Sequence, residues 1–301
     1  YEYGTVFIPV QNQKLQGIEL YQFLEKVATK SHISMYGVST GLNDGIDLGS
    51  NNFSAIKKPK VAMLVGDGIS GNDSGEVWHL LDTRVHMPIT KIPMRNFNRA
   101  NLDKYNTLVM VSGRYNLTKK QQAKIKDWTS KGNTLITIGT ASKWAIDKKL
   151  VDEKLTKTEK DSTKTVVQKP YVDAGENIGK ESVGGVILKV DIDITHPLAF
   201  GYHDTSIPVY KNNTVWLSPS KNSYATVAKY NKDPHIDGFM TEKNIEENVK
   251  QSASLIVSKV GSGRVVLFAD NPNFRGSWYG TNRLFLNALF LGDKINVPSE
   301  D

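Results

Sequence analysis

Short apolar runs alternate with helix-forming segments through the first half of the chain. Four runs have the length and the apolar character of buried strands, at Lys60–Gly68, Pro88–Ile92, Thr107–Ser112 and Thr134–Ile138. Continuous apolar runs of this kind are typical of parallel strands that are covered on both faces. Strands that alternate with helices over short connections predict a doubly wound, mostly parallel α/β sheet of the flavodoxin-like, three-layer type.

Capping signals and apolar spacing indicate where the helices lie. Ser74 can cap a helix that carries Val77 and Leu81, and Thr118 with Gln121 has the spacing of a capping box. The segment Thr281–Leu291 is apolar on nearly all sides, so we expect this helix to be largely buried. Further predictions are a helix at Asn244–Ser252 and strands at Val186–Asp191, Thr214–Leu217, Ala225–Lys229 and Arg264–Ala269.

The sequence predicts two regions of unequal size. Residues 1–58 form a small N-terminal α/β extension or linker, with strands at Thr5–Val10 and His32–Val38 around a helix at Ile18–Lys30. Residues 59–301 form the main domain, with a charged insertion near 148–182 that is poor in large apolar residues. Because the chain opens on an apolar strand-like run without a signal-peptide pattern, we expect it to be a fragment of a longer polypeptide.

Composition excludes several classes of function. Hydrophobic residues make up 39% and charged residues 23% of the 301 residues, as in ordinary globular proteins. The formal net charge is +7, but the basic residues are interspersed with acidic ones, which argues against nucleic-acid binding. No apolar run is long enough to predict a membrane span. The chain contains no cysteine, which excludes disulfides and cysteine nucleophiles.

A strand-to-helix turn at Asn133–Lys143 is the first place to look for catalysis. In α/β folds, such a turn after a buried strand exposes a reactive serine or cysteine. The sequence here is Gly139-Thr140-Ala141-Ser142-Lys143, and we place Ala141 at the apex. Because alanine has no nucleophilic group, we expect no nucleophilic catalysis at this turn.

Polar residues follow several of the predicted strands. Parallel strands bring their carboxyl ends to one edge of the sheet, where ligands bind in open α/β folds. The candidate ligand-binding edge consists of Asp67, Gly68, Arg114, Tyr115, Ser142, Asp270, Asn271 and Asn273. Arg114 is the natural counter-charge for Asp67 or Asp270. The same residue types also serve as caps and turns, so a functional cleft and a purely structural role are both open.

Metal and nucleotide signals are weak. His79 and Asp82 lie one helical turn apart, but a catalytic zinc needs three protein ligands. The glycine-rich stretch from Gly66 to Gly71 matches neither the dinucleotide fingerprint nor the P-loop. We therefore expect no metal and no cofactor in this segment.

Two resemblances add to this picture. The order of strands, the loop after TLVMVSG and the elbow ITIGTAS resemble the class I glutamine amidotransferase-like fold. In that family a cysteine occupies the elbow and a His-x-Glu pair follows the late strand. Here Ala141 stands at the elbow by our alignment, and Asp270-Asn271-Pro272 stands where the histidine is expected. The resemblance therefore implies a pseudo-amidotransferase domain.

Three segments resemble the C-terminal region of large secreted bacterial zinc carboxypeptidases of the carboxypeptidase A type. They are PKVAMLVGDGISGNDSGEVWHLLD, HPLAFGY and GSGRVVLFADNPNFRGSWYGTNRLFLNALF. This resemblance implies a non-catalytic accessory domain for docking, stability or substrate recognition, with the peptidase domain of the same polypeptide as its partner. It also implies a secreted or periplasmic location, with zinc confined to that peptidase domain. The alternatives are a hydrolase or a small-molecule or glycan-binding domain at the polar edge, with Trp278 and Tyr279 as stacking surfaces.

Overall fold

The structure, a computed structural model, describes residues 1, 4–156 and 168–298. It divides into two compact units, Tyr1–Ile56 and Lys57–Asp301. The insertion expected near 148–182 lies partly outside the described residues.

The first unit is helical rather than α/β. It contains helix α1 (Gly17–Ser31) and a short 3-10 helix at Val10–Asn12, and its described residues form no strand. The two strands expected here are therefore wrong. Leu20 is the single buried residue in the described part of this unit. A strand needs a neighbouring strand to pair its backbone N–H and C=O groups, and the described residues of this unit contain no such neighbour.

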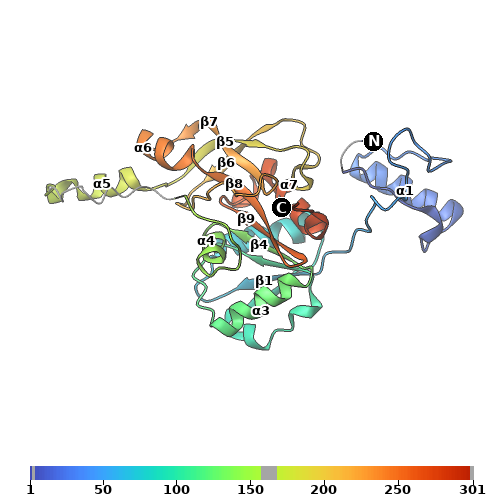
Figure 1. Cartoon of the computed structure of the whole chain (residues 1–301), viewed down its shortest axis with the longest axis horizontal. Coiled ribbons are helices and arrows are strands. Elements are labelled where there is room, and N and C mark those ends of the chain that lie inside the picture. Colours follow the sequence, from blue (N-terminus) through green and yellow to red (C-terminus); the bar gives the residue numbers. More distant parts are fainter. Residues whose placement is uncertain (2–3, 157–167, 299–301) are drawn as a thin grey trace. The chain divides into compact units, whose positions relative to one another are not determined.

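The second unit is built on one nine-stranded sheet in the order β2-β1-β3-β4-β9-β8-β7-β5-β6. Figure 1 labels β1, β4 and β9 of its parallel part and the strands β5 to β8. Its first five strands are parallel: β2 (Thr90–Pro93), β1 (Val61–Val65), β3 (Thr107–Met110), β4 (Thr134–Ile138) and β9 (Gly263–Phe268). Strand β4 pairs with β9 in register from Thr134↔Arg264 to Ile138↔Phe268. The predicted doubly wound α/β class is thereby confirmed.

The other four strands extend the sheet by antiparallel pairing. They are β8 (Ala253–Val260), β7 (Thr226–Gly238), β5 (Val186–Ile192) and β6 (Ser206–Lys211). Because β7 and β6 again point the same way as the first five strands, only β8 and β5 are reversed. Strands β6 and β8 lie outside the predicted set, and the strand predicted at Thr214–Leu217 is reduced to isolated bridges at Leu217.

Helices cover the parallel part of the sheet. Helix α2 (Gly71–His79) joins β1 to β2, and α3 (Lys119–Ser130) joins β3 to β4. Thr118 and Gln121 form the predicted capping box of α3, whereas Ser70 rather than Ser74 caps α2. Helix α4 (Thr140–Asp147) follows β4, and α7 (Tyr279–Leu291) follows β9. Shorter helices are α5 (Ala174–Glu181), α6 (Glu242–Asn244) and π-helical turns at Leu80–Arg84 and Ile245–Val249.

The core lies on both faces of the parallel strands. All four residues of β3 and all five of β4 are buried, as the continuous apolar runs predicted. Helix α7 contributes Leu284, Phe285 and Leu289 to this core. The central strands β3 and β4 are therefore enclosed by apolar side chains along their whole length.

Candidate functional site

The residues that follow β1, β3, β4 and β9 lie at one edge of the sheet. These four strands run parallel, so Asp67, Arg114, Ser142 and Asn271 all come after carboxyl ends on the same side. Within this edge the side chains separate into a buried group around β4 and β9 and an exposed group around β1 and β3.

The apex of the strand-to-helix turn is Gly139, not Ala141. Gly139 lies between the last residue of β4 and the first residue of α4, and its backbone has φ 57° and ψ −123°. This left-handed region strongly favours glycine. Ala141 lies one residue inside α4 and is fully buried, so it faces the core. The elbow therefore carries no side chain at its apex.

Neighbouring groups fill the space above this apex. A Cβ atom built on Gly139 would overlap Ser112 Oγ and would lie 3.9 Å from Asn213 Nδ2. Thr140 Oγ1 accepts a hydrogen bond from the Gly113 N–H at 2.8 Å. In acyl transfer, backbone N–H groups beside the nucleophile stabilise the developing oxyanion. Here the Gly113 N–H already has a partner in Thr140 Oγ1, and Gly139 itself has no side chain that could act as a nucleophile.

Ser142 is a structural residue. Its side chain is fully buried, its Oγ donates to the Phe268 carbonyl at 2.8 Å, and it lies 2.9 Å from Thr137 Oγ1. These bonds tie α4 to β4 and β9. No imidazole or carboxylate in the described part of the chain is hydrogen-bonded to Ser142, so it lacks the base that a serine nucleophile needs.

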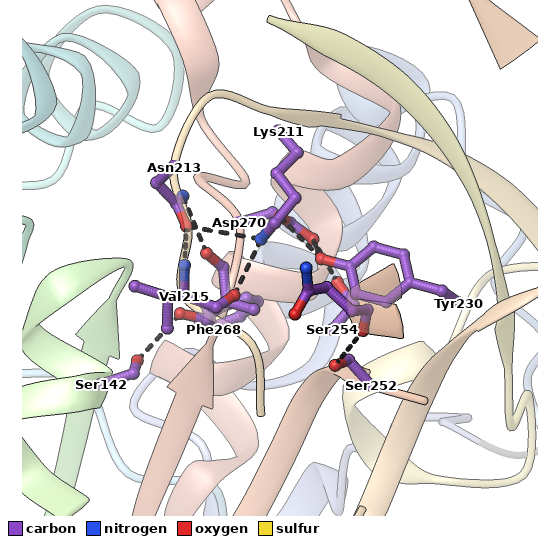
Figure 2. A network of polar contacts seen from close by, with 11 residues as sticks. Ser142, Lys211, Asn213, Val215, Tyr230, Ser252, Ser254, Phe268 and Asp270 are labelled. Carbon is purple, nitrogen blue, oxygen red and sulfur yellow. Dashed lines mark hydrogen bonds and ion pairs between the residues drawn. The ribbon is translucent and has the colours of Figure 1, made fainter. Parts of the chain in front are cut away.

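Asp270, directly after β9, is the centre of a buried polar network (Figure 2). Its carboxylate accepts hydrogen bonds from Lys211 Nζ at 3.0 Å, from Tyr230 Oη at 2.8 and 2.9 Å, and from Ser254 Oγ at 2.6 Å. Both carboxylate oxygens are thus occupied. The cationic partner of Asp270 is Lys211, and not Arg114 as the sequence suggested.

Lys211 is also fully satisfied. Its ammonium group donates to Asp270 Oδ1, to the Val215 carbonyl at 2.9 Å and to Asn213 Oδ1 at 3.4 Å. It lies 4.3 Å from the centre of the Trp216 ring. Burial lowers the pKa of Lys211, an effect that the charge of Asp270 opposes, and burial raises the pKa of Tyr230 well above its usual value. A lysine with every donor used has no proton or lone pair to offer a substrate.

The position of Lys211 depends on the curvature of the sheet. It is the last residue of β6, and three strands separate β6 from β9 in the sheet order. The side chain nevertheless reaches Asp270, so the antiparallel half curves back over the edge. Tyr210 stacks on Phe274 with ring centroids 3.7 Å apart, which closes the same side. Lys211 and Tyr210 therefore bring the end of β6 against the loop that follows β9.

Asn271 and Asn273 are likewise buried. Asn271 Nδ2 donates to Glu76 Oε2 at 2.5 Å, and the Arg275 N–H donates to Glu76 Oε1 at 2.6 Å. Burial raises the pKa of Glu76. Asn273 Oδ1 accepts from Asn282 Nδ2 at 3.0 Å. These contacts hold the loop after β9 against α2 and α7.

The exposed group lies at the ends of β1, β2 and β3. Asp67, Gly68 and Arg114 line a cavity of about 390 Å³ together with Met94, Arg95, Asn116, Leu117 and Gln121. Tyr115 does not belong to it, because its buried hydroxyl donates to the Val111 carbonyl at 2.6 Å. Of the eight predicted residues, this cavity brings together three. Sequence reasoning missed Arg95, which follows β2, and the network residues Lys211, Tyr230 and Ser254.

Within the described residues, no group of three or more histidine, aspartate or glutamate side chains is arranged to hold a metal ion. No described helix combines the length and apolar character that crossing a bilayer requires. Trp278 is half-buried near Tyr210, while Tyr279 is exposed and lies 4.2 Å from the Arg84 guanidinium.

Comparison with known proteins identifies the fold but no family. No protein-family profile matches the sequence, and no curated protein matches it. A solved structure described as a ThuA-like protein, from Parabacteroides merdae, is similar with a TM-score of 0.54 and 11% identity over 81% of this chain and 93% of that chain.

Two further solved structures carry amidotransferase or synthase descriptions. A glutamine amidotransferase from Thermotoga maritima gives a TM-score of 0.44 and 8% identity over 76% of this chain and 81% of that chain. A protein from Thermoplasma acidophilum, described as a subunit of a GMP synthase, gives a TM-score of 0.47 and 11% identity over 77% of this chain and 94% of that chain. At 11% identity, the similarity to the ThuA-like structure shows a shared α/β fold alone.

Proposed function

We propose that residues 57–301 are a non-catalytic, amidotransferase-like accessory domain. The observation that carries this proposal is Gly139 at the apex of the elbow, where a nucleophile would have to stand. The buried Lys211–Asp270 pair supports it, because the late-strand position is occupied by a carboxylate that is fully committed to structural bonds.

The parent polypeptide in this proposal is a secreted or periplasmic zinc carboxypeptidase, and the domain serves its docking, stability or substrate recognition. The support for this part is the sequence resemblance of three segments, which include the strands β1 and β9 and the helix α7. Zinc chemistry would then belong to the peptidase domain of the same polypeptide.

A hydrolase at the polar edge is the weaker candidate. It would need Ser142 or Thr140 as nucleophile with an imidazole in reach. Ser142 is fully buried, and Thr140 Oγ1 is hydrogen-bonded to the backbone of Gly113. His196, the one buried histidine among the described residues, uses its Nδ1 to accept from the Leu198 N–H at 3.1 Å.

The experiment that tests the accessory role compares the intact polypeptide with the same polypeptide lacking residues 57–301. We expect the intact protein to release C-terminal residues from peptides in a zinc-dependent reaction. Removal of the domain should change its thermal stability or its KM for long peptides while the hydrolysis of short substrates continues. An intact protein without zinc and without peptidase activity would contradict the proposed parent, and leave the non-catalytic elbow to be tested separately.

A further inference from the structure

The exposed cavity lies at the point where the order of the sheet reverses. From β1 the chain crosses to β2 on one side and then to β3 on the other. In open α/β sheets, ligands bind in the crevice outside the carboxyl ends of the strands at such a switch point. The cavity is lined by residues that follow all three strands, with Asp67 after β1, Arg95 after β2 and Arg114 after β3.

The walls of this cavity are held in place by the backbone. The Arg114 N–H donates to the Gly68 carbonyl at 2.8 Å, and the Ser70 N–H donates to the Ser112 carbonyl at 2.8 Å. Gly68 has φ 82°, and a Cβ atom there would lie 2.9 Å from the Arg114 carbonyl oxygen. The close approach of these two loops therefore requires glycine at position 68. A fixed wall of this kind lowers the ordering cost of binding.

Three charged side chains that line the cavity have no side-chain partner among the described residues of the protein. Asp67, Arg95 and Arg114 are exposed, and within the described residues no side-chain hydrogen bond or ion pair involves any of them. Elsewhere in this unit, the buried Lys211 is paired with Asp270, and the buried Arg264 donates to backbone carbonyls. Two guanidinium groups and one carboxylate give this small cavity one excess positive charge.

The charges and the apolar wall together select a class of ligand. Guanidinium groups bind carboxylate and phosphate through paired N–H donors. Asp67 would repel a phosphate dianion but would attract an ammonium group placed beside a carboxylate. Met94 and Leu117 add an apolar surface for a side chain. A free α-amino acid with an apolar side chain carries a carboxylate, an ammonium group and that side chain on a single carbon atom.

We propose that this cavity binds a free α-amino acid, with its carboxylate held by Arg95 and Arg114, its ammonium group by Asp67 and its side chain against Met94 and Leu117. The proposal is independent of the peptidase parent and of the elbow, since it rests on the cavity alone. Either can fail without the other.

Calorimetric titration of the whole chain with L-leucine tests the proposal without any substitution. We expect binding of L-leucine, and weakening by about tenfold or more for leucinamide and for N-acetyl-leucine, each of which loses one charge-assisted contact. Inorganic phosphate should not compete. Absence of leucine binding would overturn the proposal, and so would phosphate binding as tight as that of leucine.

Substitutions then locate the site. Arg114→Gln and Asp67→Asn should each weaken leucine binding by about tenfold or more. Arg99→Gln is the matched control, because Arg99 is exposed on the same 3-10 helix (Met94–Arg99) as Arg95 but does not line the cavity. Unfolding followed by tryptophan fluorescence confirms that each variant is folded. Leucine binding that is unchanged in both cavity variants, or lost equally in the Arg99 variant, would overturn the assignment.

Discussion

Lys211 Nζ and Asp270 Oδ1 lie 3.0 Å apart, and both side chains are buried although the two residues are 59 positions apart in the sequence. The pair joins the end of β6 to the end of β9 across the curved half of the sheet. It occupies the part of the edge where the resemblance to amidotransferases led us to look for a catalytic residue.

Lys211→Met should destabilise the second unit by about 3–5 kcal/mol, because it leaves the buried Asp270 carboxylate without its cation. The measurement is urea unfolding followed by tryptophan fluorescence, which reports on this unit since all five tryptophans lie within it. Lys259→Met, at an exposed position of β8, is the control and should change stability little.

The double variant Lys211→Met/Asp270→Asn measures how much the two charged groups stabilise one another, apart from the packing of each side chain. Removal of both charges avoids an unpaired buried ion, so the combined loss of stability should be smaller than the sum of the two single losses. Strict additivity would show that the two groups do not interact.

Gly139→Ala should cost about 1–3 kcal/mol through its left-handed backbone, and more if Ser112 cannot move away from the added Cβ. Gly75→Ala is the matched control. Gly75 lies inside α2 with open space around its Cβ position, so alanine there should be neutral or stabilising by up to about 1 kcal/mol. Equal stability of the two variants would refute the placement of Gly139 at the apex.

His196 should make the stability of this unit depend on pH. Burial lowers its pKa from 6.5 to about 4, and its Nδ1 must stay unprotonated to accept from the Leu198 N–H. The unfolded chain therefore binds this proton more readily than the folded one. The free energy of unfolding is therefore unaffected by this group above about pH 6.5. It falls by about 3 kcal/mol as the pH decreases from 6.5 to about 4.

His196→Asn keeps a side-chain acceptor for the Leu198 N–H and removes the titrating group. We expect the variant to lose the steep part of the stability profile between pH 6.5 and 4. His203→Asn, at an exposed position, should keep the profile of the natural protein. A profile that is as steep in the His196 variant would show that other groups cause the dependence.

The sequence predicts the parallel half of the fold well, for a local reason. Strands β1, β3 and β4 are continuous apolar runs, and β4 begins and ends where the pattern places it, at Thr134 and Ile138. The antiparallel half is harder. Much of β7 consists of polar residues in the stretch NKDPHIDG, whose exposed positions carry no alternation of apolar and polar residues.

The candidate site was less predictable because its key contacts are long-range. Nothing near Lys211 in the sequence marks it as buried, and its partner Asp270 has the sequence context of an ordinary loop aspartate. The elbow was found, but its apex was misplaced by two residues. The glycine in ITIGTAS was the available signal, since a sharp strand-to-helix turn requires a residue that tolerates positive φ.

The most direct test of the non-catalytic proposal is a turnover assay on the purified chain with glutamine and with C-terminally unblocked peptides. We expect release of neither ammonia nor amino acids above a heat-denatured control, because Gly139 offers no nucleophile and Ser142 Oγ is bonded to the Phe268 carbonyl. Turnover by the natural chain that survives Gly75→Ala but disappears in a folded Ser142→Ala or Thr140→Val variant would contradict the account.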